Sequence, residues 1–306
     1  MIKCALISGR GMGLMHGGNF HSHPDAEVVA VCDMDPELLA AATEQFGAPG
    51  YSSIEELLAN CDVDLMLMIV NETRRIPPLR QLLAAEKMTS PSQRRQSLSG
   101  EDSGLKFGID FNYRFMTHFR KLHDDVVEGR LGEIRMVRAR AHFNCWSHVI
   151  DQILWNMGRP EWVSVMGDPS EEGGWQRMIQ MQWANGAIGS LAGSNLWGYD
   201  DHPLRVMIVG DERYAEARGL EGWYRRREAN TSEDEELWES EEGNSYQTSF
   251  PRMADGVIKA MHANESFPAD GEAAWNELLF EGAVHRSALN NGERVWLADV
   301  EKAAMS

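Results

Sequence analysis

The N-terminal part of the chain repeats one order of apolar and polar segments. Residues 3–8 form a short apolar run that leads into a glycine-rich turn and then into a helix start at residues 14–16. A second apolar run at 27–32 precedes a helical pattern at 36–46, and a third run spans 63–70. Strands that alternate with helices in this way predict a parallel sheet with right-handed crossovers.

The rest of the chain follows a different order. Residues 89–104 lack apolar periodicity and predict an irregular loop, whereas residues 105–111 predict a strand that is followed by a helix. Several strands with few helices between them then indicate a mostly antiparallel sheet. We expect these strands at 134–143, 162–167, 175–183, 187–192 and 204–210, and helices at 147–157 and 271–290 that cover one face of the sheet.

Composition supports a two-domain globular protein and excludes some partners. The 306 residues are 43% hydrophobic and 25% charged, as in ordinary globular proteins. The formal net charge of −18, from 47 acidic and 29 basic residues, argues against nucleic acid and anionic membranes as partners. Part of the excess lies in one acidic run, which we interpret as a solvated loop or strand edge: Glu233, Asp234, Glu235, Glu236, Glu239, Glu241 and Glu242.

Cysteine usage indicates a reducing compartment. The four cysteines have no CxxC spacing and are interpreted as reduced core residues, so neither disulfides nor a zinc site is expected. Since no leader-like N-terminus and no long apolar window is found, we expect a cytoplasmic protein. His21, His23 and Asp25 resemble metal ligands only in isolation, and no metal site is predicted.

The glycine-rich turn suggests a dinucleotide site. Gly9, Gly11 and Gly13 follow the first predicted strand, where a backbone free of side chains can approach a pyrophosphate at a helix N-terminus. Asp33 follows Gly13 by about 20 residues, and a carboxylate there binds a ribose diol and repels a 2′-phosphate, which favours NAD over NADP. No register gives the complete G-x-G-x-x-G pattern, so a turn that only packs a strand on a helix is the alternative.

Several strings together resemble the glucose–fructose oxidoreductase / inositol dehydrogenase family (Gfo/Idh/MocA). They are residues 7–16, EVVAVCDMDPE at 27–37, YSSIEELL at 51–58, VDLMLMIV at 63–70, FGIDFNYRF at 107–115, GRLGEIRMVRAR at 129–140, SHVIDQILWNMG at 147–158 and HRSALNNGERVWL at 285–297. The resemblance implies bound NAD(H) or NADP(H), sugar-like or cyclitol substrates, and a homo-oligomer formed through an exposed sheet face. The expected fold is an α/β Rossmann domain with a parallel sheet over residues 1–118, followed by an α+β domain with a large, mostly antiparallel open sheet over residues 119–306.

The chain departs from this family at the cofactor site. If His16 aligns with the family histidine, the three fingerprint glycines fall on Ser8, Arg10 and Gly13, so two of them are replaced. The family's Glu-Lys-Pro motif is missing and its nearest counterpart is residues 93–95, where an arginine stays protonated and cannot shuttle protons. The cofactor-binding residues expected from the turn and the resemblance are Ser8, Gly9, Arg10, Gly11, Met12, Gly13, Asp33 and Asn71.

His148 and Asp151 are the predicted catalytic pair. They lie one turn apart on a predicted helix and therefore on one face of it. The resemblance implies that the histidine at this position removes the proton of a substrate hydroxyl, and a nearby carboxylate can orient it. The alternative is a helix capped by Ser147 whose histidine packs against the sheet.

The predicted substrate residues lie near the same helix. Asn112, Tyr113 and Arg114 stand at a predicted strand end, where ligands of open α/β sheets gather, although Arg114 can equally form a salt bridge at the domain junction. His142 and Asn144 complete the set, Asn144 by its alignment with a family aspartate.

The sequence leaves three functions open. The first is oxidation of a hydroxyl on a sugar, sugar derivative or cyclitol by NAD. The second is a non-catalytic or cofactor-impaired member that acts as a ligand-binding or scaffold protein, which the missing lysine motif and glycines favour. The third is an NAD-assisted lyase or glycosidase.

Overall fold

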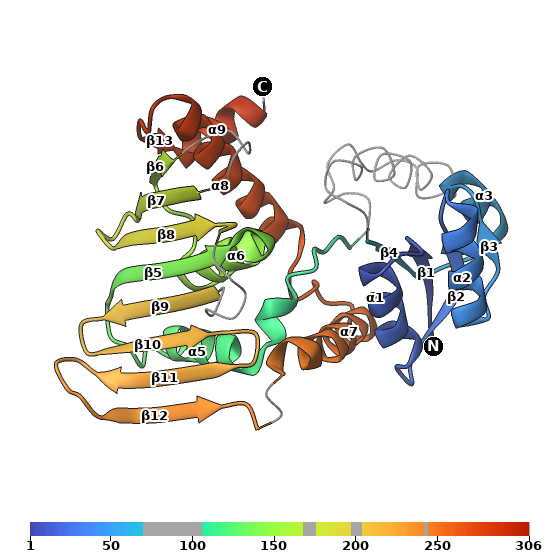
Figure 1. Ribbon diagram of the computed structural model, residues 1–306, viewed down its shortest axis with the longest axis horizontal. Coiled ribbons are helices and arrows are strands. Elements are labelled where there is room, and N and C mark those ends of the chain that lie inside the picture. The colour runs from blue at the N-terminus through green and yellow to red at the C-terminus, as the bar shows by residue number, and fades with distance from the viewer. Residues whose placement is uncertain (70–105, 168–175, 197–203, 242–243, 306) are drawn as a thin grey trace. The chain divides into compact units, whose positions relative to one another are not determined.

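The computed structural model describes residues 1–69, 106–167, 176–196, 204–241 and 244–305. The chain forms two compact units (Figure 1). The first unit comprises Met1–Lys106 and Phe250–Pro268, and the second comprises Phe107–Ser249 and Ala269–Ser306. The division therefore falls earlier than the boundary expected at residue 118, and a C-terminal segment expected in the second domain belongs to the first unit.

The first unit is a parallel sheet with its connecting helices. Its strands pair in the order β3-β2-β1-β4, with β1 at Ile2–Ile7, β2 at Ala26–Cys32, β3 at Gly50–Tyr51 and β4 at Leu65–Met68. The helices α1 (Met12–His21), α2 (Pro36–Phe46) and α3 (Ile54–Asn60) alternate with the strands, which confirms the predicted order. Local signals set the ends of α2, because Asp35 caps its first amides and Gly47 ends it in the left-handed conformation.

A late segment completes the first unit. Helix α7 (Ser245–Ala263) passes from the second unit into the first, where Phe250 is 1% exposed and meets the ring of His16 edge-on at 5.1 Å. Further along, the Lys106 ammonium donates to the carbonyl oxygen of Glu265 at 2.6 Å. These contacts join residues that are far apart in the sequence, and periodicity alone does not reveal them.

The second unit is built on one large sheet. Among the described residues the strand order is β12-β11-β10-β9-β5-β8-β7-β6-β13, and only the β5–β8 pair there is parallel, which confirms the mostly antiparallel sheet. The strands are β5 (Ile134–His142), β6 (Trp162–Gly167), β7 (Gln176–Gln182), β8 (Ile188–Ser194), β9 (Leu204–Gly210), β10 (Arg213–Arg218), β11 (Trp223–Glu228), β12 (Asp234–Glu239) and β13 (Val295–Trp296). Asp234–Glu239 of the acidic run form β12, an end strand of the sheet, which agrees with one of its two interpretations, a strand edge, although no strand was predicted there.

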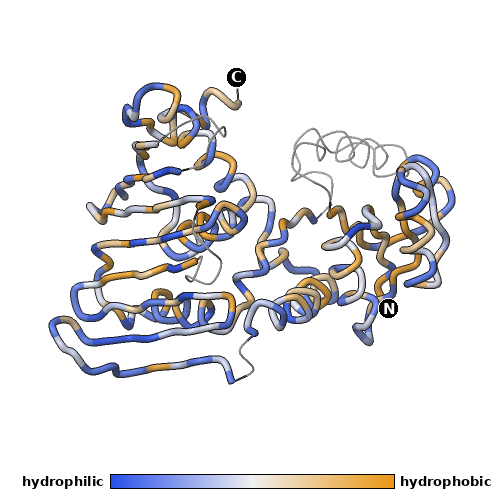
Figure 2. Tube along the Cα trace, in the orientation of Figure 1, coloured by the Kyte–Doolittle hydropathy of each residue, from blue (hydrophilic) through white to orange (hydrophobic). Residues whose placement is uncertain are grey.

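The two faces of this sheet differ in character. Helices α5 (Thr117–Val127), α6 (Trp146–Met157) and α8 (Gly271–Leu289) pack on one face, where Val137, Val206 and Ile208 are fully buried. The alternate residues of each strand point to the other face, which we call the outer face. Figure 2 shows that β9 is largely hydrophobic and that β11 and β12 are largely hydrophilic. A short helix, α9 (Leu297–Ala304), follows β13.

The strand expected at residues 105–111 is wrong over its described part. Only Gly108 forms a bridge, to Asp270, and the amide of Phe111 turns back to the carbonyl oxygen of Ile109. The chain then enters a 3-10 helix, η2, at Asn112–Phe115. With a single bridge partner, the apolar run has no ladder of hydrogen bonds to hold it extended.

The cysteines are free thiols, as predicted. Cys4, Cys32 and Cys145 are buried, and burial raises the pKa of Cys4 to about 12 and that of Cys32 to about 11. These thiols therefore stay protonated and unreactive at neutral pH. In the part of the chain that the structure describes, no helix combines the length and apolar character needed to cross a membrane.

Candidate functional site

The predicted cofactor residues 8–13 lie in the turn between β1 and α1 and at the start of α1. The amide of Gly13 donates to the carbonyl oxygen of Arg10 at 2.7 Å and closes this turn. Helix α1 starts after Gly11, and no side chain of the described residues caps its first amides. Uncapped amides at a helix N-terminus are suited to bind an anion such as a pyrophosphate.

Three glycines of the turn are needed for different reasons. A Cβ on Gly9 would lie 2.5 Å from the carbonyl oxygen of Leu38 in α2, and a Cβ on Gly13 would lie 2.7 Å from that of Ser8. Gly11 has a φ of +37° and nothing within 4 Å of the place where its Cβ would stand. Gly9 and Gly13 therefore permit close packing inside the protein, whereas Gly11 leaves open space at the start of the helix.

Ser8 has a positive φ, a backbone conformation that is usually found at glycine. Its φ of 140° lies in the region that side chains disfavour. The residue stands where the family alignment expects the first fingerprint glycine. The backbone at this position therefore has a conformation that glycine adopts more readily than serine.

Asp33 links the end of β2 to this turn. One carboxylate oxygen accepts from the amide of Gly9 at 2.7 Å, and the other accepts from the amide of Asp35 at 2.9 Å. A carboxylate accepts about four hydrogen bonds, so Asp33 can accept further bonds from a ribose diol besides these two. The uncapped helix, the open space at Gly11 and Asp33 together fit an NAD molecule.

The other predicted cofactor residues differ in what the structure shows. Arg10 and Met12 are exposed beside the turn. Asn71 and the segment 93–95, the counterpart of the family's lysine motif, lie outside the described residues.

His148, in the second unit, is held by an aromatic stack. Its ring lies parallel to that of Tyr113 at 4.2 Å, with an interplanar angle of 16°. Tyr113 is 3% exposed, stacks on Phe119 from α5, and donates from its hydroxyl to the sulfur of Cys145 at 3.3 Å. The plane of the imidazole is thus fixed by packing from η2.

Asp151 is bonded to Arg114. The guanidinium donates Nε to one carboxylate oxygen at 2.9 Å and Nη2 to the other at 2.5 Å, and both side chains are buried. Burial raises the pKa of Asp151 to about 6, although the bonds from Arg114 act to lower it. The salt bridge of Arg114 therefore joins two residues of the second unit, whereas the salt bridge expected for it was one at the domain junction. The orienting bond from Asp151 to His148 stays a prediction.

The remaining predicted substrate residues have local partners. The ring nitrogen Nδ1 of His142 accepts from the amide of Asn144 at 3.1 Å, so its Nε2 carries the proton when the ring is neutral. The amide of Asn112 is buried and donates to the hydroxyl of Ser249 at 2.8 Å. Asn144 is exposed.

The histidines that resemble metal ligands have other partners. Nδ1 of His21 accepts from the amide of Val28, and Nδ1 of His23 accepts from that of Asp25. Nε2 of His23 lies 3.5 Å from Asp255 of α7. Each of these bonds holds the turn between α1 and β2 within the first unit.

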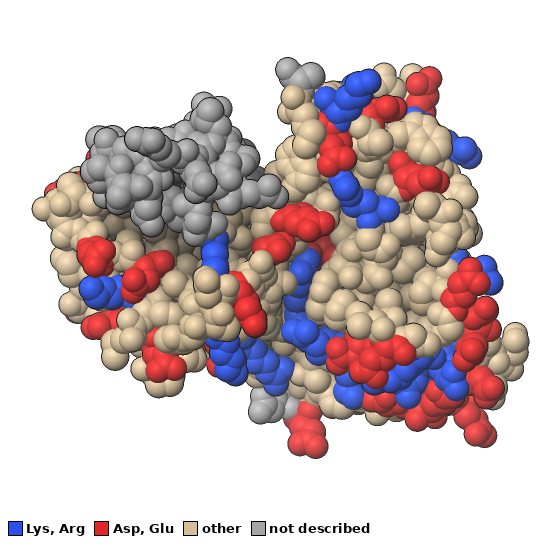
Figure 3. Space-filling view, turned by 180° about the vertical axis from the view of Figure 1, so that it is seen from behind, with Lys and Arg blue, Asp and Glu red and all other residues tan. Residues whose placement is uncertain are grey.

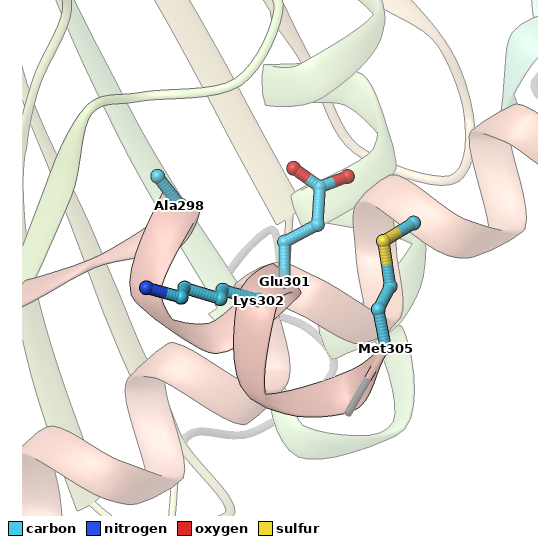
Figure 4. Close-up of a pocket in the computed structure, with 4 residues that line it drawn as sticks. All are labelled: Ala298, Glu301, Lys302 and Met305. Atoms are coloured by element: carbon cyan, nitrogen blue, oxygen red, sulfur yellow. The ribbon is translucent and has the colours of Figure 1, made fainter.

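The surface also has an open depression on α9 that carries no predicted site residue. Figure 4 shows that Ala298, Glu301, Lys302 and Met305 line it. Glu301 pairs with Arg159 at 2.9 Å, so its carboxylate has a structural partner.

Sequence reasoning missed the neighbours that complete the second-unit cluster. Trp155 lies 5.2 Å from the Arg114 guanidinium and stacks on His123 at 3.5 Å. Phe119 and Cys145 hold Tyr113 as described above. Trp155 lies four residues after Asp151 and therefore on the same face of α6. The sequence gives no signal that Trp155 contacts Arg114 of η2 or His123 of α5.

The N-terminal part of the chain matches a known family. Residues 2–89 match the model of the Gfo/Idh/MocA oxidoreductase family, described as having an NAD-binding Rossmann fold. A curated relative, inositol 2-dehydrogenase of Rhizobium meliloti (strain 1021), is 23% identical over 146 residues. That match covers 44% of this chain and 44% of the relative, so it spans less than half of either protein.

Solved structures share the whole fold. The WlbA dehydrogenase from Bordetella pertussis, in complex with NADH and UDP-GlcNAcA, has a TM-score of 0.79 at 20% identity, over 96% of this chain and 97% of that one. An oxidoreductase from Agrobacterium radiobacter, in complex with NAD+, L-tartaric acid and magnesium, has a TM-score of 0.78 at 17% identity, over 97% and 99% of the two chains. These similarities show that the chain shares the fold of these structures.

Proposed function

Because residues 2–89 match the Gfo/Idh/MocA family of NAD-binding oxidoreductases, we propose that the chain oxidises a hydroxyl of a sugar, a sugar derivative or a cyclitol. The observation that carries the proposal is the turn between β1 and α1, where open space at Gly11 and uncapped amides meet the carboxylate of Asp33. The inositol 2-dehydrogenase of Rhizobium meliloti and the two solved structures in complex with NADH and NAD+ support the same class of reaction.

The first unit holds the cofactor in this proposal. The amides that start α1 bind the pyrophosphate, and Asp33 binds a ribose diol and disfavours the 2′-phosphate of NADP. Ser8, Gly9, Arg10, Met12, Gly13 and Asn71 complete the proposed contact set. When bound, the nicotinamide supplies the acceptor for a hydride.

His148 accepts the proton of the substrate hydroxyl. A neutral imidazole is a suitable base near pH 7. Its ring is held flat on Tyr113, so the lone pair of the unprotonated nitrogen has a fixed direction. Asp151 acts by holding Arg114, and Asn112, Tyr113, Arg114, His142 and Asn144 form the proposed surroundings of the substrate.

Two experiments test this proposal: the first measures cofactor binding and the second measures turnover. Calorimetry with NAD and NADP is followed by a screen of polyols and sugars that detects reduced nicotinamide. His148→Ala should lose turnover while NAD affinity is kept, and His285→Ala, at an exposed histidine of α8, serves as the matched control. Absence of NAD and NADP binding at millimolar concentration would overturn the enzyme proposal.

The second candidate is a ligand-binding or scaffold protein. It is favoured by Ser8 and Arg10 at glycine positions and by the lost lysine motif. This candidate predicts saturable binding of a sugar with no reduction of the cofactor. An NAD-assisted lyase or glycosidase is recognised by product analysis that shows elimination without net NADH.

The protein is further proposed to be a cytoplasmic homo-oligomer. Free buried thiols suit a reducing compartment. The outer face exposes Met166, Met178, Ile188 and Trp296, and a hollow on it is lined in part by Met136, Gln180 and Ile188. Ile188→Glu should dissociate an oligomer in light scattering, whereas Leu278→Glu on α8 should not.

A further inference from the structure

One buried amide on helix α6 has no role in the packing of the second unit. The Gln152 side chain is 0% exposed, and among the described residues neither its Oε1 nor its Nε2 has a hydrogen-bond partner. A buried polar group without a partner loses its bonds to water and gains none in return, which destabilises the folded chain. An apolar side chain of similar size would fill the same space without this cost.

Gln152 lies on the face of α6 that also carries His148. The two residues are four apart in the helix, so their side chains are neighbours on its surface. His148 contacts η2 by stacking on Tyr113. Asn156, four residues after Gln152, contacts α5, where its Oδ1 lies 3.2 Å from Nδ1 of His123. Gln152 stands between these two contacts and therefore faces the seam between α6 and the elements η2 and α5.

The two ring nitrogens of His148 have different surroundings. Nδ1 is buried, so Nε2 is the nitrogen that a substrate hydroxyl can reach. For Nε2 to accept a proton its lone pair must be free, and the neutral imidazole then carries its own proton on Nδ1. An acceptor inside the protein that bonds to Nδ1–H stabilises this tautomer over the other.

Two side chains with acceptor oxygens follow His148 within one helical turn. They are Asp151 and Gln152. Both oxygens of Asp151 already accept from Arg114, at 2.9 Å from Nε and at 2.5 Å from Nη2. Oε1 of Gln152 has no such partner in the part of the chain that the structure describes. Gln152 is thus the acceptor that remains available.

We propose that Gln152 is a positioning residue for His148, whose side chain turns about its torsions so that Oε1 accepts from Nδ1–H and holds Nε2 unprotonated. The inference rests on the proposed role of His148 as the base. Hydrogen bonds of catalytic groups are often poorly aligned before substrate binds, and a glutamine reaches a neighbour one turn away by changing rotamer. Asp151 then acts on Arg114 and Gln152 acts on His148, so the two adjacent residues have separate roles.

The first test measures the tautomer of His148 and needs no turnover. Long-range proton–nitrogen NMR correlation of the isotope-labelled full chain distinguishes Nδ1–H from Nε2–H in a neutral histidine, and the signals lost in His148→Ala identify His148. The Nδ1–H tautomer should dominate in the wild type and lose this majority in Gln152→Leu. Gln152→Glu keeps an acceptor oxygen and should retain the majority. Gln247→Leu, at an exposed glutamine of α7, is the matched control and should leave the tautomer unchanged.

The second test measures turnover with a substrate found in the sugar and polyol screen. Gln152→Leu should lower kcat about tenfold, the effect of one lost hydrogen bond to a group that becomes charged in the reaction. The KM for NAD should not change, because Gln152 belongs to the second unit and the proposed cofactor turn to the first.

Two results would overturn the proposal. The first is a wild-type His148 in which the Nε2–H tautomer dominates, and the second is a tautomer that Gln152→Leu leaves unaltered. Both are measured without cofactor or substrate, so they are distinct from a failure of NAD to bind, which overturns the enzyme function alone. If Gln152→Leu does not fold, Gln152→Met takes its place, because the flexible thioether fills irregular gaps in a core.

Discussion

Arg114 and Asp151 form a two-pronged ion pair that is buried within the second unit, with N–O distances of 2.9 and 2.5 Å. The pair joins η2 to α6 one residue after Tyr113 and one helical turn after His148. The stack and the ion pair therefore fix the same two elements against each other at adjacent positions.

Asp151→Asn should destabilise the second unit strongly. The substitution leaves the buried Arg114 charge without a counter-ion, which costs about 3–5 kcal/mol in the free energy of unfolding. Urea unfolding followed by tryptophan fluorescence measures it. Asp62→Asn, at a side chain that is 97% exposed, should change stability by less than about 0.5 kcal/mol. Equal effects of the two substitutions would show that the buried pair is not needed for stability.

His118 predicts a loss of stability in mild acid. Burial lowers its pKa from 6.5 to about 3 in the folded protein. The unfolded chain therefore binds the extra proton between these pH values, and stability falls as the pH drops below 6.5. Once the pH is well below the pKa of the histidine in the unfolded chain, the free energy of unfolding falls by about 1.4 kcal/mol per pH unit. His118→Gln should remove this component, and a wild-type slope equal to that of the variant would contradict the assignment.

Ser8→Gly should stabilise the first unit. Glycine adopts the φ of 140° without strain, which is worth about 1 kcal/mol or slightly more. Thermal unfolding measures the change. Ser147→Gly, the same substitution at an exposed helical position, should instead destabilise by about 0.5 kcal/mol. If both changes destabilise alike, Ser8 is not strained.

Gly9→Ala should destabilise the first unit and weaken any cofactor binding. The added methyl group would meet the carbonyl oxygen of Leu38 at 2.5 Å, so the turn or α2 must move, at a cost of about 1–3 kcal/mol. Gly18→Ala in α1 is the matched control, because its nearest neighbour would be 3.9 Å away and alanine favours helices. In chemical unfolding, Gly9→Ala should lower the free energy of unfolding and Gly18→Ala should raise it. A Gly9→Ala protein as stable as the wild type would show that the turn does not pack tightly on Leu38.

Strands with buried apolar side chains were predicted from the sequence more accurately than strands with charged side chains. Strands β6 and β9 were predicted at their observed bounds because apolar residues fill them. Strands β10, β11 and β12 were not predicted as strands, since their side chains are largely arginines and acids that pair with each other across the sheet, as Arg227 does with Asp234. Periodicity detects burial of apolar groups and does not detect a sheet held by ion pairs.

The candidate site was only partly accessible from the sequence. The turn residues Gly9, Gly13 and Asp33 are close in sequence to the elements they join, and their spacing predicts their arrangement. The partner of Arg114 and the stack of Tyr113 on His148 depend on how η2 meets α6. That geometry is set by tertiary packing, which the local periodicity of apolar and polar residues does not predict.

The acidic end strand β12 has a consequence for the protein's behaviour at high concentration. An end strand offers unpaired backbone groups to which another strand can add, and this is a common route to fibrils. Figure 3 shows acidic and basic side chains interleaved over this end of the second unit. If two copies of β12 were paired, their carboxylates would lie against each other. The charge repulsion of the acidic run at 233–242 therefore opposes the edge-to-edge association of sheets from different copies at neutral pH.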